Sequence, residues 1–423
     1  MMDNCQNEKQ YNSSCVPIVI GITGHRDIVK RDESELRTAI KKIFDDLKKS
    51  YPHSPLLVLS ALAEGADCMA ADEAIKSGIP VKAPIPMAVE EYEKDFSDNA
   101  SLSEFRRLLT QCEAYYVVSD SDVRPYSYRQ SGMYIAEHCH ILIAFWDGIY
   151  HIDKIGGTSE IVKFKLEGNH PSFTESMGKA NHNLLITPNR GAVYHILTPR
   201  KSNTAPVGKD FSLRKLLIDK SDSDCGAEMV INRILSSINE YNKDVSCLTS
   251  KLSKSIEESK KSIIEDTDKP LLSVSQQKLL NAYATADQLS MHYRNKRLLY
   301  LKLLTSAGLA LVLFFLLYDE LESNIMLPLY IMVLIGAYFI NFLANKRELQ
   351  NKYVDYRALA EGLKVQFYWS VCGVHLNVSE HYRFGQLDEL IWIRYAITGC
   401  LDHQTHTADP IEQEKAFHIA NKS

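Results

Sequence analysis

The chain has 423 residues, of which 45% are apolar and 24% charged, and its formal net charge is −5 at pH 7. This length predicts two or three domains, and the negative balance gives no overall basic field, so nucleic acid is not expected as a partner. The nine cysteines show no CxxC pair or zinc-ligand spacing, which is typical of reduced thiols in a cytosolic setting. The first 15 residues contain no apolar core of signal-peptide length, so no secretory signal is expected.

Residues 16–200 alternate between short apolar runs and longer amphipathic segments. Short apolar runs of this kind, separated by helical segments, predict an α/β domain with a mostly parallel sheet and right-handed crossovers. Ligands in such sheets bind at the carboxyl ends of the strands, near the point where the strand order reverses. Six strands are predicted, at 17–23, 55–60, 79–85, 113–119, 140–146 and 192–198.

Two glycine-containing loops follow the first two predicted strands. In the first loop, "GITGHRD", glycines allow a tight turn and close ligand approach, and His25 and Arg26 suit an anion. In the second, "SALAEGADCMAADEA", Gly65 begins a helix directly after a strand. The free amides and dipole of a helix start favour a phosphate there. Asp67 near this start could serve only as a cap.

A third loop follows the fifth predicted strand, in "FWDGIYHIDKIGGTSEIV". Gly156, Gly157 and Thr158 precede a helix, and Glu160 lies in its first turn, where a carboxylate also favours the helix dipole. Upstream, residues 128–130 (Tyr-Arg-Gln) enter the same sheet edge. Each loop alone also fits a plain structural turn, but three of them on one sheet predict a nucleotide or nucleotide-sugar site.

The region after the α/β domain is expected to be helical. Residues 201–225 are polar and predict a linker, and 226–297 predict a helical connector. Apolar residues recur there in steps of three and four, which is a heptad seam. This seam could join two subunits or pack on the helix that follows within the same chain. Its members are Ile231, Ile234, Ile238, Tyr241, Val245, Leu248 and Leu252.

Two apolar segments, 298–318 and 325–344, are long enough to cross a bilayer as helices of ~30 Å. The alternative is a buried hairpin of a soluble protein. Basic residues flank the two apolar segments at 294–297 and 346–347, whereas the connecting loop 319–324 is acidic. The positive-inside rule therefore predicts a multi-pass protein with both termini in the cytoplasm. Residues 345–401 predict cytosolic helices and 402–423 a polar tail.

The motifs "GITGHRD", "ALAEGADCMAADEA" and "HILIAFWDG…GGTSE" resemble the SLOG (SMF/DprA–LOG) superfamily. That superfamily has a Rossmann-like fold and binds nucleotides and their derivatives, and the resemblance covers 16–200. The segments at 355–374 and 389–396 are similar to the part that follows the hairpin in SLATT-like two-transmembrane effector modules, which occur fused to SLOG domains. Carried over by motif, the implied ligand-binding residues are Gly21, Thr23, Gly24, His25, Arg26, Glu64, Gly65, Asp67, Arg129, Gly156, Gly157 and Thr158.

The resemblance implies an effector of bacterial antiphage defence in the inner membrane. A partner enzyme would make a nucleotide signal, either a cyclic nucleotide or an ADP-ribose derivative. Its binding would drive oligomerisation of the hairpins, which then permeabilise or disrupt the bilayer. No metal or further cofactor is implied; the "EHCH" run at 137–140 leads into a strand, where its side chains alternate between the two faces.

Two other functions compete with this one. LOG-type members hydrolyse the N-glycosidic bond of nucleotides, and Arg129 with Glu160 would be the catalytic pair, although "IGGTSEIV" lacks the family's Pro-Gly-Gly start. A carboxylate there could stabilise the positive charge that develops on the sugar. The third function is a constitutive membrane scaffold. The fusion to a membrane hairpin favours a sensor over an enzyme, so no catalytic residue is assigned.

Overall fold

A computed structural model of the chain describes residues 14–119, 121–150, 155–167, 191–201, 213–216, 224–321, 325–346, 348–374, 376–381 and 391–401. The predicted tail at 402–423 lies outside the described residues. The predicted fold class is confirmed: an α/β layer is followed by a long helical region that contains two apolar helices.

A seven-stranded sheet in the order β4-β3-β2-β1-β5-β6-β7 forms the α/β part. All neighbouring strands from β4 to β6 pair in parallel, and β7 pairs antiparallel to β6. The strand order reverses between β1 and β5. The strands are β1 Ile18–Gly24, β2 Leu56–Leu59, β3 Val81–Ile85, β4 Ala114–Val117, β5 Ile141–Trp146, β6 Ala192–Leu197 and β7 Leu213–Leu216. The six predicted strands are therefore present, whereas β7 lies inside the stretch predicted as a linker.

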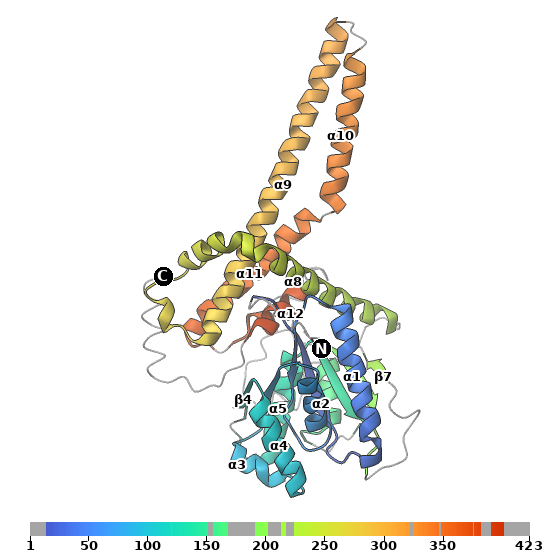
Figure 1. Ribbon diagram of the computed structural model, residues 1–423, viewed down its shortest axis with the longest axis vertical. Coiled ribbons are helices and arrows are strands. Elements are labelled where there is room, and N and C mark those ends of the chain that lie inside the picture. Colours follow the sequence, from blue (N-terminus) through green and yellow to red (C-terminus); the bar gives the residue numbers. More distant parts are fainter. Residues whose placement is uncertain are drawn as a thin grey trace, which may run out of the picture.

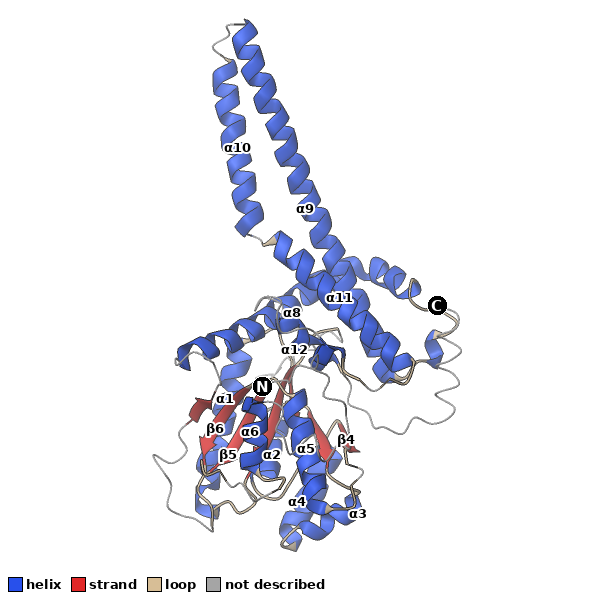
Figure 2. Ribbon diagram, turned by 180° about the vertical axis from the view of Figure 1, so that it is seen from behind, coloured by secondary structure: helices blue, strands red, loops and turns tan. Residues whose placement is uncertain are grey.

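Helices cover both faces of this sheet (Figure 2). The buried residues of β1 divide by alternation: Ile18, Ile20 and Ile22 face α1, α2 and α4, and Val19 faces α5 and α6. Both faces are apolar because a parallel sheet is buried on both sides. The helices of this part are α1 Glu33–Ser50, α2 Ala66–Lys76, α3 Val89–Tyr92, α4 Asn99–Gln111, α5 Arg124–His138 and α6 Thr158–Glu167, with short 3₁₀ turns at Lys30–Asp32 and Glu93–Asp95.

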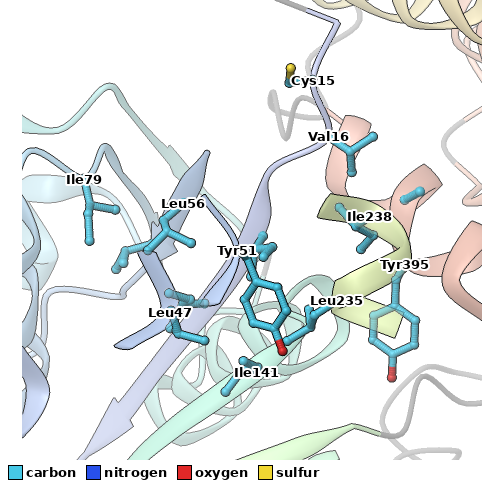
Figure 3. Packing of buried hydrophobic residues seen from close by; sticks show 14 of the residues in the cluster. Cys15, Val16, Leu47, Tyr51, Leu56, Ile79, Ile141, Leu235, Ile238 and Tyr395 are labelled. Carbon is cyan, nitrogen blue, oxygen red and sulfur yellow. The ribbon is translucent and has the colours of Figure 1, made fainter. Parts of the chain in front are cut away.

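The helical region lies across the amino ends of the strands (Figure 1). It consists of α8 Asp224–Lys261, α9 Val274–Leu321, α10 Met326–Lys346, α11 Leu349–Val371 and α12 Ile391–Cys400, with 3₁₀ turns at Lys269–Leu271 and Val378–His381. The heptad seam of α8 packs within the chain, since its first five members are buried in the common core. Of the two predicted arrangements for this seam, internal packing is therefore the one observed. Figure 3 shows Leu235 and Ile238 of α8 in the same cluster as Val16 and Tyr51.

Buried hydrogen bonds fasten the amino end of β1 to the helical region. The side chain of Asn242 in α8, which is fully buried, accepts from the Val16 amide at 2.8 Å and donates to the Val16 carbonyl at 2.8 Å. The imidazole of His140 accepts from the Val19 amide at 3.1 Å through Nδ1 and donates to the Tyr395 carbonyl at 2.8 Å through Nε2. Burial lowers the pKa of His140 to about 3, so the ring is neutral. We call these two contacts the β1 clamps.

The apolar hairpin consists of the second half of α9 and all of α10, which project side by side from the rest of the chain (Figures 1 and 2). Both helices are long and apolar enough to cross a membrane, and none of their most apolar stretches is buried within the protein. α9 continues without a break from the helical core into its apolar half. By contrast, Glu348 adopts a left-handed conformation with φ +47° and separates α10 from α11.

Candidate functional site

A cavity of about 300 Å³ opens at the carboxyl ends of β1 and β5, where the strand order reverses. We call it the switch-point cavity. Open parallel sheets bind their ligands at this position. Its described lining comes from the first loop (Gly24, His25, Arg26), the third loop and start of α6 (Ile155, Gly156, Gly157, Thr158, Ser159), and three residues from other elements, Tyr128, Trp146 and Arg200.

The first and second loops interlock beside this cavity. Gly65 has φ +90°, and a Cβ atom there would lie 2.5 Å from the Arg26 carbonyl oxygen, so only glycine fits. The Ala66 amide, at the start of α2, donates to the His25 carbonyl at 3.1 Å. A Cβ on Gly24 would lie 2.3 Å from that of Ala66. Gly65 therefore supports the first loop, and the start of α2 does not line the switch-point cavity.

His25 holds the ends of the two central strands together. Its Nε2 accepts from the Asp147 amide at 3.0 Å, and its own amide donates to the Phe145 carbonyl at 3.1 Å. Burial lowers the pKa of His25 to about 4, against the attraction of Asp147. The ring is neutral at pH 7, so the Asp147 carboxylate 3.3 Å away makes no ion pair with it. His25 thus shapes the cavity without adding charge.

Arg129 and Glu160 meet behind the third loop. An Arg129 guanidinium nitrogen lies 2.6 Å from Oε1 of Glu160, and the Gly156 amide donates to Oε2 of Glu160 at 2.6 Å. Gly156 has φ +72°, and its Cβ would lie 2.8 Å from the Pro125 carbonyl oxygen. Both carboxylate oxygens therefore hold the loop in shape, and neither Arg129 nor Glu160 lines the cavity.

The charge of the cavity wall is positive. Arg26 lies over the ring of Tyr128 at 4.5 Å, and Tyr128 in turn bonds to Asp95. Arg200 is held by Asp27, with 2.9 Å between Nε and Oδ1. No acidic residue is among the described residues of the wall. Gly157 and Thr158 are also in the wall at the start of α6, where the first amides of a helix lack acceptors within it. This combination suits an anion such as phosphate.

The two acidic residues of the second loop, Asp67 and Glu64, do not line the switch-point cavity. Asp67 is buried beneath the first loop, near the backbone of Ala63 and Gly24. Burial raises the pKa of Asp67 to about 7, against the attraction of Arg26, and its Oδ1 has no hydrogen-bond partner. Glu64 accepts from the Ser97 amide at 3.0 Å and lines a second cavity of about 260 Å³.

Other predicted site residues lie away from the switch-point cavity. Gly21 lies inside β1, where a Cβ would be 2.7 Å from Ile135 in α5, so its role is close helix packing. Thr23 is buried in the same strand. Four further residues line the cavity that were not predicted as site residues: Trp146, Ile155, Ser159 and Arg200. Trp146 and Arg200 could have been found from their place at the end of predicted strands, because carboxyl ends of parallel strands share one edge.

The comparisons with known proteins place no family on the chain. No protein-family model matches it, and no curated protein matches it either. Among solved structures, the DNA processing protein A (DprA) from Streptococcus pneumoniae is similar at 17% identity, with a TM-score of 0.25. The alignment covers 34% of this chain and 45% of that protein, which is less than half of its length.

Proposed function

We propose that the chain is a nucleotide-responsive membrane protein of the SLOG type, in which ligand binding changes the state of the apolar hairpin. The observation that carries this proposal is the switch-point cavity. It combines two guanidinium groups, a helix start and no acidic residue among its described wall. Each feature favours a phosphate-bearing ligand, and together they fit one whose phosphate lies between Arg26 and Arg200.

The exposure of the hairpin supports a membrane location. A core helix of a soluble protein buries its apolar face, whereas Leu309 is 70% exposed and Phe315 62% exposed. Basic residues at the base of the hairpin and acidic residues in its connecting loop favour cytoplasmic termini. We propose insertion in the bacterial inner membrane with this orientation.

The route from cavity to hairpin runs through β1. This strand ends at Gly24 in the cavity, and the β1 clamps hold its other end to α8 and α12. α8 and α11 pack on α9, which enters the hairpin. A ligand can shift the hairpin only if it binds one of two states more tightly. A ligand that repositions the carboxyl end of β1 would act on α8 and α12 through the β1 clamps.

The resemblance to SLOG and SLATT-like proteins suggests the biological setting. We propose an effector of antiphage defence that responds to a cyclic nucleotide or an ADP-ribose derivative made by a partner enzyme. Two spans cannot enclose a pore, so the active form would be a homo-oligomer that permeabilises or disrupts the bilayer. The hydrolase alternative is less well supported, since both oxygens of Glu160 are engaged by Arg129 and the Gly156 amide. A constitutive scaffold would not require a cationic cavity.

Liposome leakage tests the proposal directly. The full chain would be reconstituted in dye-loaded vesicles and exposed to adenine nucleotides, ADP-ribose and cyclic dinucleotides. We expect dye release with a subset of these compounds and no release of free base from any. Arg200→Gln should weaken the response about 10- to 100-fold, because a charge-assisted hydrogen bond contributes ~1.5–3 kcal/mol. Arg31→Gln is the matched control, because Arg31 is exposed and outside the cavity.

Three results would contradict the proposal. Absence of leakage with every nucleotide, together with absence of nucleotide binding, would favour the scaffold. Release of free base, measured by chromatography, would favour the hydrolase. An equal response of Arg200→Gln and Arg31→Gln would show that the ligand binds elsewhere.

A further inference from the structure

The base of the apolar hairpin carries basic side chains from two helices. On α9, Arg294, Lys296 and Arg297 immediately precede the apolar half of the helix, which begins at Leu298. Lys251 of α8 joins them, because α8 crosses and packs against α9 below the hairpin (Figure 1). We call these four residues the basic collar. The fold, and not the sequence alone, brings the fourth cation to the hairpin.

Electrostatic effects on His292 show that cations of both helices lie close together. The pKa of His292 in α9 is lowered, first by burial and then by the charge of Lys296, and Lys251 acts in the same direction. Asp244 of α8 opposes these effects. Coulomb interactions weaken with distance, so Lys251 and Lys296 both lie near His292.

No acidic residue balances the basic collar within the described part of the chain. None of its four members makes an ion pair there. Side chains three and four positions apart on a helix are neighbours, and no Asp or Glu occupies such a position relative to any of the four. The acids that approach from α8, Glu240 and Asp244, both pair with Lys352 at 2.8 Å. The excess charge at the base of the hairpin is therefore positive.

Arg294 in particular lacks an acceptor. Its side chain is half-buried, and its Nε is shielded from solvent without a hydrogen-bond partner in the described chain. At the end of α8, by contrast, Lys260 pairs with Glu257 at 2.5 Å and Lys261 pairs with Asp266 at 2.7 Å. A guanidinium group binds phosphate through two parallel hydrogen bonds. The basic collar thus differs from a helix face whose charges are already paired.

The basic collar lies at the depth of lipid phosphates when the hairpin spans a bilayer. From Arg294 to Leu298, α9 rises about 6 Å at ~1.5 Å per residue. The headgroup layer on each side of the hydrocarbon core is roughly 5–7 Å thick. Tyr293 and Tyr300 flank the collar on α9, and tyrosine is enriched at the level of the headgroups. The positive excess would therefore face phosphate groups in a membrane.

We propose that the basic collar binds the phosphate headgroup of an anionic glycerophospholipid, which holds α8 against the membrane surface. This inference rests on the proposed membrane location but not on the nucleotide site. Basic flanks orient a span in any bilayer, whereas a collar built from two helices and free of acids selects lipids with a net negative charge. α8 also carries Asn242 of the β1 clamps, so the lipid holds the helix to which β1 is fastened.

Thermal unfolding of the purified full chain in a neutral detergent tests this inference. The probes are phosphatidylglycerol, phosphatidylcholine with the same acyl chains, and glycerol 3-phosphate as a headgroup without chains. The measured quantity is the lipid-to-detergent ratio that gives half of the maximal rise in melting temperature. Orientation in a bilayer plays no part in detergent, so lipid binding is measured separately from insertion.

We expect phosphatidylglycerol to act at a ratio at least about 10-fold lower than phosphatidylcholine. The double variant Arg294→Gln with Arg297→Gln should raise the phosphatidylglycerol ratio about 10- to 30-fold, because each base near an anionic surface contributes about 5-fold. Lys251→Gln with Lys296→Gln, which changes both helices, should act in the same direction. Each variant is compared with its own melting curve without lipid, which separates lipid binding from a change in stability.

Lys41→Gln with Lys42→Gln is the matched control, because both lysines are exposed on α1, away from the hairpin. Equal ratios for the two lipids would overturn the inference and leave the nucleotide response intact. So would an unchanged ratio in both collar variants, or an equal change in the control. A rise of the same size with glycerol 3-phosphate would assign the collar to soluble anions instead of lipid. If neither lipid stabilised the chain, the membrane location itself would be refuted, and the lipid site with it.

Discussion

Asn242→Ala should detach the amino end of β1 from α8. The Asn242 side chain makes three hydrogen bonds, two with Val16 and one with the Ser54 hydroxyl at 2.9 Å. Alanine would leave the amide and the carbonyl of Val16 buried without partners. Each unsatisfied group costs ~1–3 kcal/mol, so the local cost is about 2–6 kcal/mol. Since ~1.4 kcal/mol corresponds to a factor of ten, the population of the opened state should rise at least about 30-fold.

Hydrogen exchange measured by mass spectrometry on the full chain would detect this opening. We expect faster exchange in peptides that cover Val16 and the first half of β1. Asn239→Ala is the matched control. Asn239 lies half-buried on the same helix and accepts from the His53 amide at 2.8 Å and from the Ser54 hydroxyl at 3.5 Å, both outside β1. If the two variants exchange alike around β1, then Asn242 does not hold the strand and the proposed route to the hairpin is wrong.

Three further substitutions test the third loop, the cap of α5 and the buried Asp67. Gly156→Ala should weaken nucleotide binding by about 10-fold or more in calorimetry. A residue with a Cβ costs ~1–2 kcal/mol in a left-handed conformation, and this Cβ would also meet backbone atoms. An unchanged affinity would show that the third loop is not part of the site. Lys165→Met should lower the melting temperature by several degrees, because the buried Lys165 ammonium donates to the carbonyls at the end of α5 at 2.6 and 2.7 Å. A melting temperature equal to that of the wild type would show that Lys165 does not stabilise this helix end. Asp67 has its pKa raised to about 7 from 3.8, so its contribution to stability is complete below pH 3.8 and is lost as the pH rises through 7. Asp67→Asn should therefore stabilise the protein at pH 8 by up to about 4 kcal/mol and have little such benefit at pH 4, and a pH-independent difference in melting temperature would contradict the raised pKa.

The central strands could be predicted from the sequence, because strands that are buried on both faces form continuous apolar runs between turns. β7 was missed for the opposite reason. It is a four-residue edge strand, Leu-Arg-Lys-Leu, inside a polar stretch, and short alternation of that kind does not stand out. The heptad seam of α8 was compatible with pairing between subunits and with packing inside the chain. Apolar residues at helical spacing predict that a helix face is buried, but they do not identify the chain that covers it.

The position of the site was more predictable than the roles of its residues. Parallel strands bring their carboxyl ends to one edge, so the first and third loops were expected to meet there. A glycine in the sequence, however, does not reveal whether a ligand, a helix or another loop approaches it. The missing side chain of Gly21 leaves room for α5, and that of Gly65 leaves room for the first loop. Only the structure distinguishes these roles. Arg200 follows a strand far along the chain, and its place beside Arg26 depends on the whole sheet.

The uninterrupted course of α9 gives the hairpin two unlike arms. With 48 residues, the helix is about 72 Å long at ~1.5 Å per residue, so a tilt of about 5° at its end in the helical core displaces its tip by roughly 6 Å. α9 is therefore a stiff lever whose small movements are enlarged at the tip of the hairpin. The other arm is jointed, because the left-handed residue Glu348 lets α10 follow a different direction from α11. A rigid arm beside a jointed one converts a small rotation of the helical core into a change in the angle between the two apolar helices.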